Sequence, residues 1–288
     1  MSLKINKPLV SVDWLHRNFG NENLIILDCT IPKVTVKSVI TEQKKQIIGT
    51  VFFDIKNVFS DDKAAFPNTI LSPEKFEKEA QKIGINKDST IVVYDNFGIY
   101  SSPRVWWMFQ LMGFKNIAVL NGGLPMWKAR KLPTENKLNN TLPIGSFKAN
   151  YQSEKIKFTD DVLLAINNKA ILIADARSKG RFLALEQEPR KDVKGGHIPN
   201  SVSLPFSEII DKGVLKPEED LKVLFNNINP KNKFFIFSCG TGITASVLAL
   251  GAELIGMKNY AVYDGSWTEW GSTKDLPIER SDEKHYLE

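Results

Sequence analysis

A single cysteine stands at the start of a glycine-containing loop in the C-terminal half of the chain. Cys239 opens the sequence CGTGIT, which lies between two apolar runs, KFFIF and SVLALGAELIG. The first run predicts a buried strand and the second a helix. Gly240 and Gly242 allow backbone angles that other residues avoid, so the loop amides can turn inward. Inward amides and the positive end of a helix stabilise a thiolate, and we therefore interpret Cys239 as a nucleophile rather than a small buried apolar residue.

Two other cysteine chemistries fit the loop less well. A cysteine phosphatase needs an arginine about six residues after the nucleophile to clamp the phosphate. The segment at this position is ITASV, which contains no arginine. A thiol hydrolase needs a histidine as general base, for which His197 in GGHIPNS is the plausible candidate. Its position between Gly-Gly and Ile-Pro favours a structural role in a turn.

The loop belongs to a sequence that occurs twice. LMGFKNIAVLNGGLPMW, which starts at Leu111, matches LIGMKNYAVYDGSWTEW, which starts at Leu254, at a constant offset of 143. Carried upstream without gaps, this register places Asn96 opposite Cys239 and beside Asp95. Neither residue carries a thiol, so we expect the chemistry of the cysteine in the second copy alone.

Each copy alternates short apolar runs with amphipathic ones, which predicts α/β domains with a mainly parallel sheet and helices on both faces. We predict two tandem domains, 8–142 and 157–280, joined by a polar linker at 143–156. The expected strands of the second copy are Ile171–Ala174, Ser201–Leu204, Phe234–Phe237 and Tyr260–Tyr263. Its expected helices are Asp160–Asn167, Pro217–Asn226 and Ala245–Ile255, the last of them closed by Gly256.

The composition narrows the choice of partners. The net charge of +5 comes from lysines spread along the chain, and without a dense basic run we expect no nucleic-acid partner. No apolar stretch is long enough to cross a bilayer, so we expect no membrane partner and a cytoplasmic location. Two cysteines and three histidines without ligand spacing predict no disulfide framework and no metal site. We expect no organic cofactor.

The motifs together resemble those of the tandem rhodanese-type sulfurtransferases. SCGTGITAS, the preceding GGHIP, the following YDGSWTEW and SSPRVWWMFQLMGF in the first copy carry the resemblance, which covers the chain from about Pro8 to Glu279. It implies one α/β fold for both copies and a catalytic cysteine in the second. It also implies that Cys239 takes up sulfane sulfur as a persulfide and passes it to thioredoxin, a small thiol or cyanide.

Within this family the loop after the cysteine separates two donors. Enzymes that prefer thiosulfate carry basic residues there, whereas those that prefer 3-mercaptopyruvate carry a neutral loop. The neutral loop here implies 3-mercaptopyruvate as donor and pyruvate as product, and the resemblance implies substrate contacts from Gly240, Thr241, Gly242 and Thr244.

Arg181 and Arg190 match the arginines with which the family holds its substrate. A guanidinium suits a carboxylate because its planar fork makes two hydrogen bonds and keeps its charge. Without the motif, each arginine would be interpreted as a surface residue in a weak ion pair.

The sequence departs from the family in one respect. A histidine and an aspartate that some mercaptopyruvate enzymes place near the loop hydroxyl fall on Asn68 and Lys56. Asparagine forms hydrogen bonds but accepts no proton at neutral pH, so a histidine relay is excluded and Asn68 is expected to line the cleft between the domains. A thiosulfate:cyanide sulfurtransferase and a non-catalytic rhodanese-like binding module stay open as alternatives.

Overall fold

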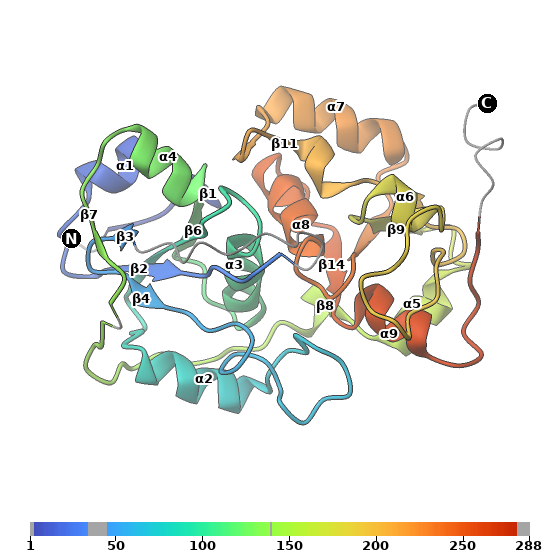
Figure 1. Ribbon diagram of the computed structural model, residues 1–288, viewed down its shortest axis with the longest axis horizontal. Helices are drawn as coiled ribbons and strands as arrows, with labels where there is room; N and C mark the ends of the chain where they lie inside the picture. Colours follow the sequence, from blue (N-terminus) through green and yellow to red (C-terminus); the bar gives the residue numbers. More distant parts are fainter. Residues whose placement is uncertain (1–2, 34–44, 139, 281–288) are drawn as a thin grey trace. The chain divides into compact units, whose positions relative to one another are not determined.

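The computed structural model describes residues 3–33, 45–138 and 140–280 (Figure 1). The chain divides into two compact units that follow the two halves of the sequence, apart from two short segments. Residues 64–69 belong to the second unit although they precede most of the first, and residues 210–215 belong to the first unit. Within the described residues, no helix is both long and apolar enough to cross a membrane.

Each unit contains a five-stranded parallel sheet. The order in the first is β1 (Leu9–Val10), β6 (Ile117–Leu120), β5 (Thr90–Tyr94), β2 (Leu24–Asp28) and β4 (Val51–Phe52). The order in the second is β8 (Ile156–Lys157), β14 (Tyr260–Tyr263), β13 (Phe234–Ser238), β9 (Ile171–Asp175) and β10 (Val202–Ser203). Strands of equal rank in the two copies take equal places, which confirms the duplication and the α/β class.

Helices cover both faces of the first sheet. α1 (Val12–Arg17) and α4 (Gly123–Ala129) share a core with Ile26, Val92 and Trp127 on one face. α2 (Pro73–Lys82) and α3 (Ser102–Leu111) bring aromatic rings to a second cluster, in which Phe76 and Phe109 lie 5.2 Å apart. Figure 1 shows α1 beside α4, with α2 on the opposite side. Because both faces are covered, the strands are almost continuously apolar.

The second sheet is covered in the same manner. α5 (Thr159–Ala165) and α9 (Ser266–Ser272) enclose a core with Trp267 and Trp270, and Figure 1 shows these two helices together. α7 (Glu218–Ile228) and α8 (Ala245–Leu254) pack together, and Phe225 of α7 lies 5.9 Å from the ring of Phe235 in β13. α6 (Lys179–Phe182) is a single turn after β9.

The remaining elements are short. They are the pair β3 (Lys45–Ile47) and β7 (Thr134–Asn136), the hairpin β11 (Ile210–Asp211) and β12 (Val214–Leu215), and the 3₁₀ turns η1 (Ser153–Lys155) and η2 (Phe206–Ile209). Residues of the expected linker pack against the first unit. Gly145 N–H donates to Gln81 O (2.8 Å), and Phe147 N–H donates to Ile85 O (2.9 Å).

The expected elements of the second copy are confirmed with small changes of bounds. β14 agrees at both ends, α8 ends one residue early, and Gly256 follows it with φ +84°, as a C-terminal cap requires. β10 is shorter than expected, with two residues in the ladder. β8, α6 and the β11–β12 hairpin were not predicted, because segments of two to four residues show no periodicity.

Candidate active site

Cys239 lies directly after the end of β13, the central strand of the second sheet, and is 1% exposed. The loop that it opens runs to the start of α8 at Ala245. The carboxyl ends of parallel strands are where ligands bind in open α/β sheets. The cysteine therefore occupies the position at which this fold presents a reactive group.

Ser266 braces the cysteine loop from the neighbouring strand–helix turn. Its Oγ accepts the N–H groups of Cys239 (3.2 Å) and Gly242 (3.1 Å) and donates to Tyr263 O (2.8 Å). Ser266 has φ +51°, a conformation that costs a non-glycine residue energy and persists where the surroundings hold it in place. The next amide, Trp267 N–H, donates to Cys239 O (2.9 Å) and closes the loop onto α9.

The two loop glycines serve different purposes. Gly242 has φ +77°, which favours glycine, as expected. Gly240 does not take a left-handed conformation, so the expectation that both use this freedom is wrong for Gly240. A Cβ atom at Gly240 would lie 3.3 Å from Nη2 and 3.9 Å from Nη1 of Arg181. The missing side chain at position 240 leaves room for that guanidinium.

The first unit contains the same loop with a different residue in the place of Cys239. Asp28 of β2 is paired with Tyr94, whereas Asp175 of β9 is paired with Ser238. Tyr94 and Ser238 are thus the equivalent last residues of the central strands, and the residue that follows is Asp95 in one unit and Cys239 in the other.

The expectation that Asn96 stands opposite Cys239 is therefore wrong. Seven residues separate β5 from α3, whereas six separate β13 from α8. The extra residue lies in the loop, so an ungapped alignment that is correct for the helices is shifted by one residue at the strand.

The carboxylate of Asp95 shows what this loop can bind. It accepts hydrogen bonds from the amides of Phe97 (2.9 Å), Tyr100 (2.9 Å), Ser101 (3.0 Å) and Ser102 (2.9 Å). The loop thus surrounds an anion with main-chain donors at the position that is equivalent to Cys239. In the second unit the amides that match Tyr100, Ser101 and Ser102 belong to the start of α8 and the two residues before it. The same framework is suited to a sulfur anion on Cys239.

Of the two predicted arginines, Arg181 lies beside the cysteine loop, whereas Arg190 contacts Thr268, a residue that is bonded to the loop. The guanidinium of Arg181, on α6, lies beside Gly240 and is held by Glu188, whose carboxylate accepts from Nε (3.2 Å) and Nη2 (2.5 Å). Nη1 of Arg190 donates to Thr268 Oγ1 (3.4 Å), and Thr268 N–H donates to Gly240 O (2.9 Å).

Arg177 is a buried cation that the sequence did not identify. It binds Asp175 through Nε (2.9 Å) and Nη2 (2.6 Å), binds Glu188 through Nη1 (2.7 Å), and lies over the ring of Trp267 at 4.3 Å. Burial opposes its charge, but the carboxylates of Asp175 and Glu188 outweigh burial and raise the pKa of Arg177. Ser266 bonds to the loop directly, whereas Arg177 lies against Trp267 and Glu188 against Arg181, the two residues that in turn contact the loop.

Asn68 is part of the second unit, in the segment 64–69. It is 9% exposed, has φ +64°, and its Nδ2 donates to Thr241 Oγ1 (2.9 Å). Asparagine tolerates this left-handed conformation better than most residues. Lys56, at the position of the family's aspartate, belongs to the first unit. Thr244 precedes α8 and makes no capping hydrogen bond with its side chain.

The His197 side chain packs against Phe182 and not against the cysteine loop. Its ring stacks on Phe182 at 3.8 Å, and Nδ1 lies 2.9 Å from Phe182 O. Its backbone pairs with Glu279 in both directions. Burial lowers the pKa of His197. These contacts support the structural role that the sequence favoured.

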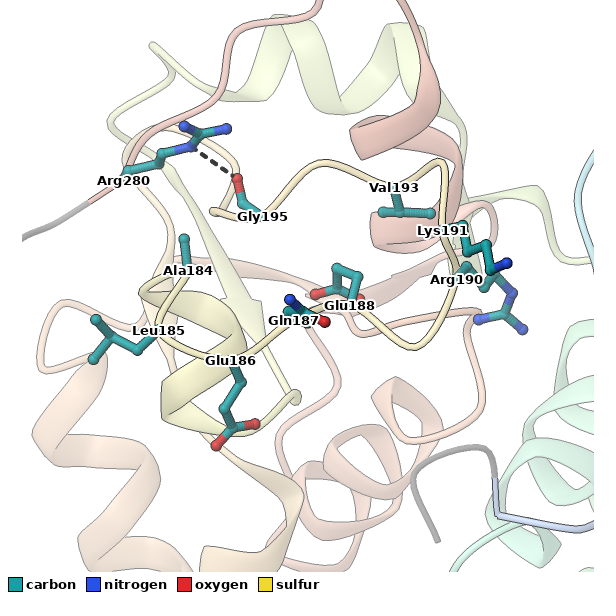
Figure 2. Close-up of a pocket in the computed structure, with 10 residues that line it drawn as sticks. All are labelled: Ala184, Leu185, Glu186, Gln187, Glu188, Arg190, Lys191, Val193, Gly195 and Arg280. Carbon is teal, nitrogen blue, oxygen red and sulfur yellow. Dashed lines mark hydrogen bonds between the residues drawn. The ribbon is translucent and has the colours of Figure 1, made fainter. Parts of the chain in front are cut away.

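A cavity of about 610 Å³ is lined mainly by residues between Ala184 and Gly195, among them Glu188 and Arg190 (Figure 2). Arg280 borders it and donates from Nε to Gly195 O (3.2 Å). Neither Cys239 nor Arg181 lines this cavity. Among the described side chains, no three His, Cys, Asp or Glu residues gather to hold a metal ion.

Comparison with known proteins places this site in a family. The model of the rhodanese-like domain matches residues 11–130 and 158–273. The 3-mercaptopyruvate sulfurtransferase of Escherichia coli K12 is 35% identical, over 94% of this chain and 97% of that protein. Thiosulfate/3-mercaptopyruvate sulfurtransferase 2 of Arabidopsis thaliana is 36% identical, over 96% and 87%.

Solved structures agree with the sequence comparison. The crystal structure of the Escherichia coli 3-mercaptopyruvate enzyme superposes with a TM-score of 0.81 at 32% identity, over 91% of this chain and 99% of that one. The Tum1 protein of Saccharomyces cerevisiae superposes with a TM-score of 0.84 at 27% identity, over 96% and 99%. With two rhodanese-like domains, one cysteine loop and relatives that match along the whole chain, this protein belongs to the tandem rhodanese-domain sulfurtransferases of the 3-mercaptopyruvate and thiosulfate family.

Proposed function

We propose that the protein takes sulfane sulfur from 3-mercaptopyruvate, carries it as a persulfide on Cys239, and transfers it to a thiol or to cyanide. The observation that carries this choice of donor is the position of the Arg181 guanidinium beside Gly240. It occupies the space into which a side chain at position 240 would extend. Any side chain there, including the basic ones that suit a dianionic donor, would crowd this guanidinium.

In the first step, the Cys239 thiolate attacks the sulfur atom of 3-mercaptopyruvate. The new bond joins the two sulfur atoms, and the bond between carbon and sulfur breaks. Its electron pair leaves on the enolate of pyruvate, which takes up the thiol proton of the donor. Cys239 holds the sulfur as a persulfide, and no external oxidant or reductant is needed.

Arg181 and Arg190 hold the donor during this step, because the bidentate fork of a guanidinium matches its carboxylate. Gly240, Thr241, Gly242 and Thr244 form the surface on which it lies. Main-chain amides at the start of α8 stabilise the charge on sulfur, as the equivalent amides stabilise the carboxylate of Asp95.

In the second step, an acceptor thiolate or cyanide attacks the outer sulfur of the persulfide. The bond between the two sulfur atoms breaks, and its electron pair returns to Cys239 as a thiolate. A protein thiol such as thioredoxin, a small thiol and cyanide are acceptors of suitable chemistry.

Asn68 assists without transferring a proton. Its Nδ2 occupies a lone pair of the Thr241 hydroxyl, which leaves the hydroxyl proton free to point elsewhere. Thr241 thereby serves as a donor to the substrate or to the sulfur anion.

A comparison of donors tests the proposal. Steady-state kcat/KM is measured with 3-mercaptopyruvate and with thiosulfate, each with cyanide as acceptor. We expect a preference for 3-mercaptopyruvate. A preference for thiosulfate would identify a thiosulfate:cyanide sulfurtransferase, and no turnover with either donor would favour a binding module.

A further inference from the structure

The carboxylate of Glu188 lies between two guanidinium groups behind the cysteine loop. Its Oε1 accepts from Nη1 of Arg177 (2.7 Å) and Nε of Arg181 (3.2 Å), while Oε2 accepts from Nη2 of Arg181 (2.5 Å). The Glu188 side chain is 4% exposed, compared with 13% for Arg181. This pairing is therefore poorly screened by solvent, and its geometry is bidentate on the Nε–Nη2 edge of Arg181.

The charges of this group cancel. Arg177 is neutralised by Asp175, which binds it in bidentate fashion, and Arg181 is neutralised by Glu188. The two pairs are joined through the Arg177–Glu188 contact. The guanidinium that reaches Gly240 therefore presents donors to a substrate without a full net positive charge.

The geometry also limits which edge of Arg181 a substrate can use. Glu188 occupies Nε and one proton of Nη2, so the edge formed by Nη1 and the remaining proton of Nη2 is left for a ligand. Nη2 and Nη1 are the atoms of Arg181 nearest to the Cβ position of Gly240, at 3.3 and 3.9 Å. One planar carboxylate fits one free edge of a guanidinium.

We propose that Glu188 is a positioning residue that determines whether the site prefers a monoanionic or a dianionic sulfur donor. By orienting Arg181 and offsetting its charge, it matches the site to a monoanionic carboxylate and disfavours a dianion such as thiosulfate. The consequence for donors rests on the proposed sulfur-transfer function, whereas the effect on the potential at Cys239 does not.

Glu188→Gln tests this directly, because the amide keeps an acceptor for Arg181 and loses the charge. Glu186→Gln is the matched control: Glu186 lies in the same loop, bonds to Ser178 Oγ (2.7 Å), and points away from Glu188 in Figure 2. We expect Glu188→Gln to raise the ratio of kcat/KM for thiosulfate to that for 3-mercaptopyruvate by about tenfold at low salt.

Alkylation of Cys239 gives a reading that is independent of turnover. Rate constants are measured for iodoacetate, an anion, and iodoacetamide, its neutral analogue, with peptide mass mapping to assign the modified cysteine. We expect Glu188→Gln to raise the anion-to-neutral ratio several-fold and Glu186→Gln to leave it within about twofold. A purely structural role would change both reagents alike.

An unchanged alkylation ratio in Glu188→Gln, or an equal rise in Glu186→Gln, would overturn the proposal. If Glu188→Gln does not fold, Arg181→Gln decides, because it leaves the charge of Glu188 in excess. The anion-to-neutral ratio must then fall, and an unchanged ratio would again overturn the proposal. Absence of turnover with both donors, together with the expected alkylation ratios, would reject the proposed function and leave the role of Glu188 standing.

Discussion

Asp95 occupies in the first sheet the position that Cys239 occupies in the second. Each residue directly follows the central strand of its unit, and each is followed by a loop that leads into a helix packed on the sheet. In the first unit the loop amides converge on the Asp95 carboxylate. The duplicated fold thus contains one loop whose amides bind the carboxylate at its start and an equivalent loop that starts with a cysteine.

Replacing Asp95 with alanine should destabilise the first unit. The change leaves amides that now bind a carboxylate without an acceptor in a buried loop, and each hydrogen bond to a charged group contributes about 1.5–3 kcal/mol. We expect a loss of at least about 3 kcal/mol in the free energy of unfolding, measured with urea.

Asp54→Ala is the control for that variant. Asp54 accepts from the amides of Lys56 (3.1 Å) and Asn57 (3.0 Å) in an exposed turn of the same unit. Its loss should cost about 1 kcal/mol or less, because water replaces the lost contacts. Equal losses in the two variants would contradict the role assigned to Asp95.

Two substitutions of Ser266 distinguish the contribution of its hydroxyl from the energetic cost of its strained backbone. Ser266→Gly removes Oγ but relieves the strain at φ +51°, and Gly123 takes the equivalent place in the first unit with φ +50°. Ser266→Ala removes Oγ and keeps the strain. We expect kcat to fall more than about tenfold in both, and alanine to be less stable than glycine by about 1 kcal/mol. Normal kcat in Ser266→Gly would mean that the hydroxyl does not position the cysteine loop.

Asn68→Asp tests the direction of the hydrogen bond to Thr241. Aspartate has nearly the same size and tolerates the left-handed backbone, but its carboxylate can only accept. The Thr241 proton would then point toward residue 68 and away from the substrate. We expect kcat/KM for 3-mercaptopyruvate to fall more than about tenfold, and to fall less in Asn68→Gly, which leaves the hydroxyl free to rotate. Wild-type kinetics in Asn68→Asp would show that Thr241 does not donate during turnover.

His197 should make stability depend on pH. Burial lowers the pKa of His197 in the folded protein below its value in the unfolded chain. The unfolded chain therefore binds more protons as the pH falls below about 6.5, and the free energy of unfolding decreases. In His197→Gln, the free energy of unfolding should decrease less between about pH 6.5 and 5. Urea unfolding at each pH measures this free energy. An equally steep decrease in the variant would exclude His197 as its source.

The sequence predicts the fold well because duplication supplies the same pattern twice. Elements with a long apolar run are visible in the sequence, such as the strand β13 and the helix α8, which is also marked by Gly256 after its end. Elements such as α6 and the β11–β12 hairpin escape prediction, because they are too short to show a period. The placement of residues 64–69 in the second unit is a tertiary property with no local signal.

For the candidate site, the sequence predicts the residues with a motif and misses those that support them. Cys239 and the two arginines stand in recognisable motifs, and the structure places Arg181 beside the cysteine loop and Arg190 one contact further away, on Thr268. Glu188 and Arg177 form contacts that depend on how the chain folds back, which spacing alone does not indicate. Ser266 did leave a signal, since the repeat places a serine opposite Gly123, a position that requires a left-handed backbone.

The most direct test of the sulfur-transfer account is the mass of Cys239 after exposure to 3-mercaptopyruvate without an acceptor. We predict that the peptide with Cys239 gains the mass of one sulfur atom, that pyruvate is released in equal amount, and that cyanide reverses the gain with formation of thiocyanate. Cys239→Ser should show neither the gain nor the pyruvate. The second cysteine, Cys29, is buried directly after β2 in the first unit. Pyruvate release in Cys239→Ser, or sulfur found on Cys29 in place of Cys239, would contradict the account.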